Sequence, residues 1–214
     1  MTNIKNTLIV GAGPAGIRAA KVLVENGLHP IVVDEAPASG GQIYRQQPSG
    51  FKRSSRDRYG FESDKADFLH SSFDRLLDKI DYRPNTGVWS LEKNIAFTSG
   101  PEGINRIPFD NLFLCTGGVD RVLPIPGWTL PGTYTLGGAQ IALKAQGCLI
   151  GEQVVFMGSG PLLYLVAYQY AKVGARVSGV FDTAKLSDAL PVLPGLLSGG
   201  VTFAKGIWYQ NWLR

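Results

Sequence analysis

The sequence predicts an α/β protein in which parallel strands alternate with helices. Three observations support this class. Residues 7–33 have the pattern of a strand, a glycine-rich turn, a helix and a strand, and residues 153–181 repeat that order. Between them, about residues 86–108, lie the short alternating runs of a β-meander. The pattern predicts two Rossmann-like domains, the first over 1–125 with the meander inside it and the second over 126–214.

A glycine-rich turn follows the first apolar run, at residues 8–10. Gly11 permits the sharp turn from strand to helix, Gly13 lets the backbone approach a phosphate, and Gly16 lets the helix pack closely on the strand. The helix that starts here presents unpaired amides, which attract negative charge. We therefore predict a pyrophosphate site at this turn, made by Gly11, Ala12, Gly13, Pro14, Ala15 and Gly16.

The second part of the predicted site is an acidic residue at the end of the next strand. A helix over 17–25 and an apolar strand over 30–33 come before Asp34. This residue lies about 20 positions after the turn, where a carboxylate accepts both hydroxyls of an adenosine ribose. The neighbouring Glu35 adds negative charge that disfavours a 2′-phosphate, and so an NADP-type ligand. The alternative is a structural glycine turn followed by an incidental acid.

The segment after the strand reads DEAPASGGQIYRQ over residues 34–46. With the turn, it resembles the two-dinucleotide-binding-domain flavoproteins. Within them it is similar to a group of FAD-bearing subunits: the A subunit of opine oxidase, the flavoprotein subunit of hydrogen cyanide synthase, the alpha subunits of dye-linked proline and hydroxyproline dehydrogenases, and part of heterotetrameric sarcosine oxidase. The resemblance implies FAD as cofactor, with contacts from Gly40, Gly41, Gln42 and Arg45. The other interpretation is a flexible surface loop.

A second motif, NLFLCTGGVDRVLPIPG, lies at residues 111–127. A buried-type strand stops at Thr116 and Gly117 and leads into prolines, and this resembles the ATG segment of the same flavoproteins. The resemblance implies that Thr116 and Gly117 lie against the flavin and that the prolines guide the chain into the second domain. It also implies a backbone contact to the adenine near Val88. Cys115 is expected to be a small core residue of a central strand.

The elements between the two motifs are expected to pack rather than to carry chemistry. Short apolar runs at 88–91, 95–98 and 104–107 predict the strands of the meander. Residues 63–80 predict a capped helix with one apolar side. That side carries Phe68, Leu69, Phe73, Leu76 and Leu77.

The second repeat departs from the first at its third glycine. A buried strand is predicted over 153–157, and Leu163 stands where the third glycine would be. Its side chain is expected to hold the helix away from the strand and to alter any phosphate cradle. Asp182 ends the next strand. A working site for NAD(H) or ATP and a degraded or repurposed site are equally open. The candidate contacts of this second adenine nucleotide are Gly158, Gly160 and Pro161.

Composition agrees with a globular α/β protein. The 214 residues are 44% hydrophobic and 18% charged, which is enough for a full core, and the net charge of +4 is mild. The basic run at 52–58 is interpreted as a solvated loop, with a surface for an anionic substrate or partner as the less favoured alternative. Neither nucleic-acid binding nor a membrane helix is expected, and the default location is the cytoplasm.

Few side chains offer chemistry of their own. Disulfide reductases of this fold need a paired-cysteine motif, whereas Cys115 and Cys148 stand far apart in the chain. The two histidines, His29 and His70, are both expected to face solvent, so neither a metal site nor a serine triad is predicted. No catalytic side chain is assigned, and the chemistry is expected to come from the flavin.

The residues and the resemblance together predict an FAD-dependent oxidoreductase subunit. It would act on an opine, imino acid or related amine beside a partner flavoprotein subunit. A non-catalytic nucleotide-binding scaffold and an NAD(P)H-dependent reductase without a redox dithiol are the alternatives. After a Pro/Gly-rich stretch at 190–200 no strand returns to the first domain, so a truncated subunit is expected. The tail aromatics Trp208, Tyr209 and Trp212 are expected to need cover from a hetero-oligomeric partner.

Overall fold

The chain forms two compact units, Met1–Val119 and Asp120–Arg214. A computed structural model describes residues 6–48, 50–51, 53–184, 191, 195 and 198–213, without the side chains of 202 and 203. The units divide after Val119, whereas the sequence placed the division after residue 125. The order of strands and helices confirms the predicted α/β class. Each unit is described by itself.

The first unit is built on a parallel sheet of four strands in the order β3-β2-β1-β7. These are β1 (Thr7–Val10), β2 (Ile31–Val33), β3 (Asp81–Arg83) and β7 (Asn111–Leu114). All three strand pairs are parallel. The carboxyl ends of β1, β2 and β7 therefore meet at one edge of the sheet, where ligands of open α/β sheets bind.

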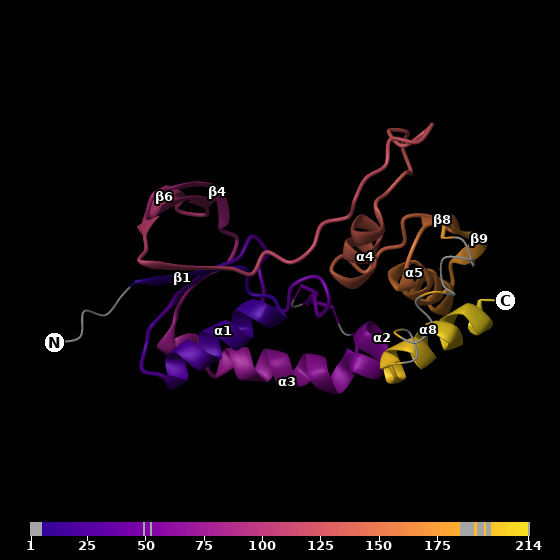
Figure 1. Ribbon diagram of the computed structural model, residues 1–214. Helices are drawn as coiled ribbons and strands as arrows, with labels where there is room; N and C mark the ends of the chain where they lie inside the picture. The colour runs from indigo at the N-terminus through magenta and orange to yellow at the C-terminus, as the bar shows by residue number, and fades with distance from the viewer. Residues whose placement is uncertain are drawn as a thin grey trace. The chain divides into compact units, whose positions relative to one another are not determined.

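Both faces of this sheet are covered, so every residue of β1 is buried. Ile9 and Val32 pack against α1 (Pro14–Glu25) and α3 (Ser63–Asp74) on one face. Leu8, Val10 and Val33 pack against meander residues on the other. Figure 1 shows the two helices and the meander on opposite sides of β1. The prediction that the first strand is buried on both faces is confirmed.

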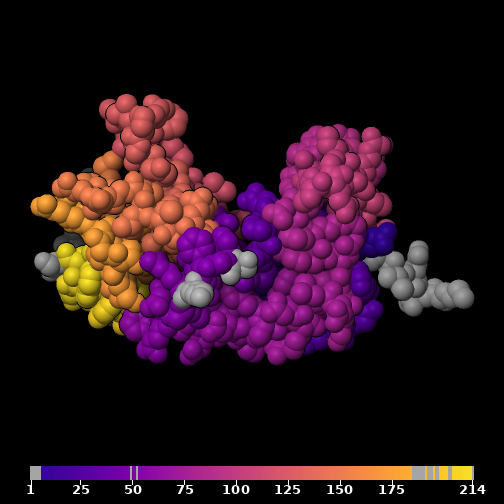
Figure 2. All heavy atoms as spheres, turned by 180° about the vertical axis from the view of Figure 1, so that it is seen from behind, coloured from indigo at the N-terminus to yellow at the C-terminus, as the bar shows by residue number. Residues whose placement is uncertain are grey.

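The meander consists of β4 (Gly87–Glu92), β5 (Ile95–Gly100) and β6 (Gly103–Pro108), paired antiparallel in chain order. The sequence predicted these strands to within two residues at each end. Ala96 and Ile107 from the meander reach the sheet core. In the space-filling view the meander stands out from the rest of the first unit (Figure 2).

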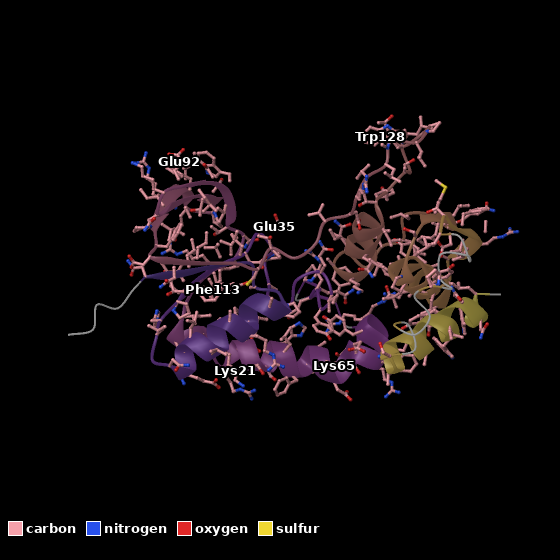
Figure 3. All side chains as sticks on the ribbon, viewed as in Figure 1. Lys21, Glu35, Lys65, Glu92, Phe113 and Trp128 are labelled. Atoms are coloured by element: carbon pink, nitrogen blue, oxygen red, sulfur yellow. The ribbon has the colours of Figure 1, made fainter. Side chains whose placement is uncertain are left out.

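Strand β7 is less covered than its apolar sequence predicted. Phe113 is 40% exposed and Leu114 is 63% exposed, because β7 is the outer strand of the described sheet. Phe113 aligns with Ile9, so it lies on the helix side of the sheet (Figure 3). Cys115 is half-buried and packs at the margin of the helix-side core. The prediction of a central, fully buried strand is wrong for this unit.

The basic run predicted as a loop contains a short helix instead. Helix α2 (Ser55–Tyr59) begins after Ser54, whose hydroxyl accepts from Asp57 N at 3.1 Å. Such a cap replaces a missing backbone partner and favours helix over loop. The polar side chains of this run that the structure describes remain exposed or half-buried. A 3₁₀ turn, η1 (Gly60–Glu62), joins α2 to α3.

The long helix predicted over 63–80 is shorter than expected and has no side-chain cap. It ends at Asp74, and a 3₁₀ turn, η2 (Leu77–Lys79), follows. Of the predicted apolar side, Leu69, Phe73 and Leu76 are buried in the core. Phe68 and Leu77 are exposed, so their packing was predicted wrongly. The Arg18 guanidinium lies over the Phe68 ring, 5.6 Å from its centre, which explains an aromatic ring at the surface.

The second unit repeats the strand–helix–strand order. Strands β8 (Gln153–Gly158) and β9 (Arg176–Asp182) pair in parallel, with α5 (Pro161–Lys172) between them in sequence. Helix α4 (Leu136–Lys144) packs into the same core. Val154 and Phe156 are buried while Val155 and Met157 are exposed. Strand β8 is therefore buried on one face only, and the prediction of a fully buried strand is wrong.

The aromatic tail forms helix α8 (Val201–Trp212). Tyr168 of α5 contacts the rings of Trp208, Tyr209 and Trp212 at centre distances of 4.8–5.1 Å. Trp208 and Trp212 remain 41% and 47% exposed, so α5 supplies part of the cover that was expected from a partner. Most of the Pro/Gly-rich stretch at 190–200 lies outside the described residues.

Residues 120–135 of the second unit carry neither helix nor strand and project from α4, with Trp128 near the tip (Figure 3). Across the described part of the chain, no helix combines the length and the apolarity that crossing a bilayer requires.

Candidate functional site

The glycine turn lies at the carboxyl edge of the first sheet, between β1 and α1. Gly11 has φ +105°, a conformation that favours glycine, and a Cβ there would collide with the carbonyl of Cys115. Gly16 lies so close to the turn that its Cβ would overlap the Gly11 carbonyl oxygen. The predicted reasons for these two glycines match the geometry. Thr116 N lies 3.4 Å from the position of a Gly11 Cβ, which brings the second motif to the same turn.

The start of α1 has no side-chain cap and no acidic residue in its first turn. Helix α4 differs, because Thr135 accepts from Gly138 N and Asp120 accepts from Gly137 N. Four amides at a helix start lack partners within the helix, and a cap or a bound anion supplies them. The backbone amides at the start of α1 are therefore available to a bound anion.

Asp34 is tied directly to the glycine turn. Its Oδ2 accepts from Ala12 N at 2.5 Å, and its Oδ1 accepts from Ala36 N at 2.7 Å. These bonds hold the carboxylate at the crevice between the ends of β1 and β2, and each oxygen keeps further acceptor capacity. The neighbouring Glu35 is exposed, and Figure 3 shows it beside the carboxyl edge of the sheet.

Tyr82 of β3 lies near this carboxylate. Burial, and then the charge of Asp34, raise the pKa of Tyr82 to about 12. Its hydroxyl is buried and has no hydrogen-bond partner among the described residues. Its ring packs edge-on against Phe73 at 4.8 Å. Tyr82 is thus close enough to Asp34 for its titration to be affected by the carboxylate charge. No sequence pattern indicated this neighbour.

The Gly-Gly segment lies against the glycine turn. Gly40 N donates to Ala12 O at 2.9 Å, and a Cβ on Gly13 would stand 3.6 Å from Gly41 Cα. Gly40 and Gly41 both have positive φ, +115° and +60°, which explains the pair of glycines. The structure therefore brings the glycine turn and the Gly-Gly segment together. A surface loop free of the turn does not fit these contacts.

Two side chains from α2 and α3 hold this segment in place. His70 Nε2 contacts Tyr44 O at 2.9 Å, and the Tyr59 hydroxyl donates to Arg45 O at 3.0 Å. Tyr59 is buried and its ring lies 5.9 Å from that of His70. The expectation that His70 faces solvent is wrong, because its ring nitrogen is paired with the loop. His29 is exposed, as expected.

The remaining predicted contacts surround the same edge. Gln42 Nε2 donates to Gly118 O at 3.2 Å, which links the Gly-Gly segment to the second motif. Thr86 N donates to Asp34 O at 2.8 Å, so the chain entering β4 and Val88 passes the end of β2. Arg45 is half-buried, and its Nε has no partner within the described ranges. Gln47, not predicted as a site residue, has both amide atoms buried without a partner there.

The second turn is built differently. Leu163 is 1% exposed, and its Cδ1 lies 3.9 Å from where a Gly158 Cβ would stand. Its side chain is therefore packed beside the turn, where the first unit has a glycine. That it holds the helix away from the strand stays a prediction. Gly160, with φ +91°, precedes Pro161 at the start of α5. Asp182 accepts from the Tyr164 hydroxyl at 2.7 Å.

Little in the described chain offers acid, base or thiol chemistry. Burial raises the pKa of the Cys115 thiol, which keeps it protonated and less nucleophilic. Cys115 and Cys148 are both free thiols. No three metal-ligating side chains gather anywhere in the described residues.

A parallel sheet with a glycine turn, an uncapped helix and a tethered carboxylate at its carboxyl edge defines a dinucleotide-binding domain. The chain belongs to the pyridine nucleotide-disulphide oxidoreductase family, whose model matches residues 5–191.

Within this family, the chain is similar in sequence to two groups of enzyme subunits. The chain is 38% identical over 197 residues to the A subunit of opine oxidase from Agrobacterium tumefaciens (strain Ach5), covering 86% of this chain and 38% of the relative. It is 34% identical over 219 residues to hydrogen cyanide synthase subunit HcnB of Pseudomonas protegens, covering 98% of this chain and 45% of the relative. The predicted resemblance is confirmed, and the chain spans less than half the length of these relatives.

Solved structures agree on the fold. L-proline dehydrogenase from P. horikoshii superposes with a TM-score of 0.67 at 16% identity, over 83% of this chain and 35% of that chain. The flavoprotein disulfide reductase RclA from Escherichia coli superposes with a TM-score of 0.59 at 22% identity, over 86% of this chain and 44% of that chain. At these identities the likeness concerns the fold alone.

Proposed function

We propose that this chain is the FAD-binding part of an oxidoreductase that oxidises an opine, an imino acid or a related amine together with a partner subunit. The observation that carries the proposal is the hydrogen bond from Ala12 N to Asp34 Oδ2, because it joins the glycine turn and the end of β2 into one crevice. Similarity to proteins named as subunits of opine oxidase and hydrogen cyanide synthase supports the substrate class and the partner. The cytoplasmic location stays a prediction.

The residues of the first unit fit the adenosine diphosphate half of FAD. The uncapped start of α1 and the backbones of Gly13, Gly40 and Gly41 would hold the diphosphate. Asp34 would accept the hydroxyls of the adenosine ribose, and the exposed Glu35 beside it disfavours an additional phosphate there. The chain near Val88 would contact the adenine, while Gln42, Arg45, Thr116 and Gly117 would lie toward the flavin.

FAD, when bound, supplies the two-electron acceptor that oxidation of a carbon–nitrogen single bond requires. The residues of this chain bind and orient it. His70 and Tyr59 fix the Gly-Gly segment over the turn, and Ala12 and Ala36 fix the Asp34 carboxylate. No catalytic side chain is assigned to this chain, so substrate binding and proton transfer are assigned to the partner.

The binding half of the proposal is tested by FAD titration of Asp34→Asn and Asp182→Asn, which change the matched acid of each repeat. Asp34→Asn removes a charge-assisted acceptor worth about 1.5–3 kcal/mol, so the affinity for FAD is expected to fall roughly 10- to 100-fold. Asp182→Asn is expected to bind FAD like the native chain. A native chain that takes up no FAD contradicts the proposal, as does equal loss in both variants.

The redox half is tested on the FAD-loaded chain under anaerobic conditions. Opines, imino acids and amines are added with and without a candidate partner subunit, to be sought among the products of neighbouring genes. Bleaching of the flavin absorbance is expected only with substrate and partner together. Bound flavin that no substrate reduces would instead identify a nucleotide-binding scaffold, and bleaching by NADH alone would identify a reductase.

A further inference from the structure

The two repeats place an aspartate at the same point but give it different partners. Asp34 Oδ1 accepts from Ala36 N at 2.7 Å, and Asp182 Oδ1 accepts from Ala184 N at 2.8 Å. The second oxygen differs. Asp34 Oδ2 accepts from the glycine turn at Ala12 N, whereas Asp182 Oδ2 accepts from the hydroxyl of Tyr164 on α5. In the second unit a tyrosine hydroxyl, in place of a backbone amide, competes with a ribose hydroxyl for this oxygen.

A second difference lies at the start of the helix. Leu163 stands at the position of Gly16 and is buried in the core beside β8, whereas in the first unit the Gly11 carbonyl lies directly against Gly16. The Leu163 amide donates to Gly160 O at 3.2 Å, so this first-turn donor is already engaged. In α1 the corresponding oxygen, Gly13 O, accepts from Ile17 N one position later. A phosphate at the second turn would therefore meet fewer open amides.

The path of the turn has also changed. The left-handed conformation belongs to Gly11, the first glycine, in the first unit and to Gly160, the second glycine, in the second unit. Above this turn the hydroxyl of Thr183 donates to Gly158 O at 3.1 Å, and Thr183 N donates to the same oxygen at 2.8 Å. The end of β9 is thus fastened onto the turn.

We propose that the second unit excludes pyridine nucleotides, and that Tyr164 is the residue that determines this. The Tyr164 hydroxyl competes with a ribose at Asp182, and at the third-glycine position Leu163 engages its own amide in the first turn of α5. The family description names a pyridine nucleotide, and the residues of this unit do not fit one. A flavin in the first unit would then exchange electrons with something other than NADH. That last consequence rests on the proposed function, whereas the exclusion itself does not.

The test measures NADH binding to the full chain by nicotinamide fluorescence. Every variant carries Asp34→Asn, because this substitution weakens the first site. The native second unit is expected to bind NADH with a Kd above about 1 mM. Tyr164→Phe removes the competing hydroxyl, so binding is expected to tighten at least about tenfold, the worth of a hydrogen bond to a charged group. Leu163→Ala added to Tyr164→Phe is expected to tighten it further.

Tyr168→Phe is the matched control, because it removes a hydroxyl from the same helix at a ring that packs on α8. It is expected to bind NADH as weakly as the native chain. A Kd of about 0.1 mM or below for the native second unit, tenfold or more tighter than expected, overturns the exclusion. Equal binding by Tyr164→Phe and Tyr168→Phe overturns the role of Tyr164. A chain that excludes NADH but takes up no FAD leaves this inference standing and contradicts only the proposed function.

Discussion

Replacing Gly16 by alanine tests how closely α1 must lie against the first glycine turn. A Cβ on Gly16 would overlap the Gly11 carbonyl oxygen and stand 3.0 Å from the carbonyl carbon and 3.4 Å from Ile9 Cγ2. Gly11 cannot yield freely, because Gly11 N donates to Val33 O at 2.8 Å. The start of α1 therefore has to move away from the sheet by roughly 1.5 Å to restore an ordinary contact.

Two effects of opposite sign set the size of the change. Alanine favours a helix interior over glycine by about 1 kcal/mol. Overfilling a packed site costs about 1–3 kcal/mol, and the overlap with a backbone oxygen places this site in the upper half of that range, at about 2–3 kcal/mol. The expected balance is a loss of about 1–2 kcal/mol in the free energy of unfolding, which lowers the Tm of a chain of this length by roughly 2–8 °C. The shift also re-aims the amides that face the phosphates, so FAD affinity is expected to fall at least about tenfold.

Gly206→Ala is the matched control, since Gly206 also lies inside a helix, α8. No atom comes within 4 Å of its would-be Cβ, so only the gain in helix propensity remains. Thermal unfolding by circular dichroism and FAD titration by flavin fluorescence compare the two variants. The reasoning is refuted if Gly16→Ala unfolds at or above the native temperature and binds FAD as well as Gly206→Ala does.

Two further predictions concern titrating groups. Because the fold raises the pKa of Tyr82 from 10.0 to about 12, its contribution is fully present below pH 10 and is lost as the pH rises to about 12. Allowing for solvent around part of the ring, urea unfolding across this window should show Tyr82→Phe losing about 1–2 kcal/mol less than the native chain; identical losses would contradict the shift. Burial raises the pKa of the Cys115 thiol, so a thiol reagent should label exposed Cys148 first and Cys115 slowly, with Cys148→Ser showing the slow phase alone. Two equal labelling rates would count against this.

Local patterns predicted the parts of the fold that depend on neighbours in sequence. The apolar run before Gly11, the meander strands and the repeat around Gly158 all appear where periodicity and glycine spacing indicated. These elements are specified by their own residues. Helix α2 was not predicted, because its charged run carries no apolar face. The N-cap of Ser54 with Asp57 is the sequence signal that could have indicated it.

The parts that sequence could not supply depend on contacts between distant segments. His70 meets Tyr44 across 26 residues, and Tyr59 meets Arg45 across 14. A histidine inside a helix shows no periodic sign of a loop that will pack on it. The exposure of β7 likewise depends on which strands lie beside it. The sequence pattern of an apolar strand does not distinguish the edge of a sheet from its centre.

At the second turn, one change can be seen in the sequence pattern and another can be seen only in the structure. The missing third glycine at Leu163 is plain in the sequence, but by itself it leaves open whether the unit still binds a nucleotide. The answer depends on Asp182, which Tyr164 engages from 18 residues away. If the second unit excludes pyridine nucleotides, as we propose, Leu163 acts by engaging an amide of the first turn of α5, and the Tyr164 hydroxyl acts by competing with a ribose for the carboxylate. Both halves of an adenosine diphosphate would then lack their usual partners, although the second repeat keeps the fold of the first.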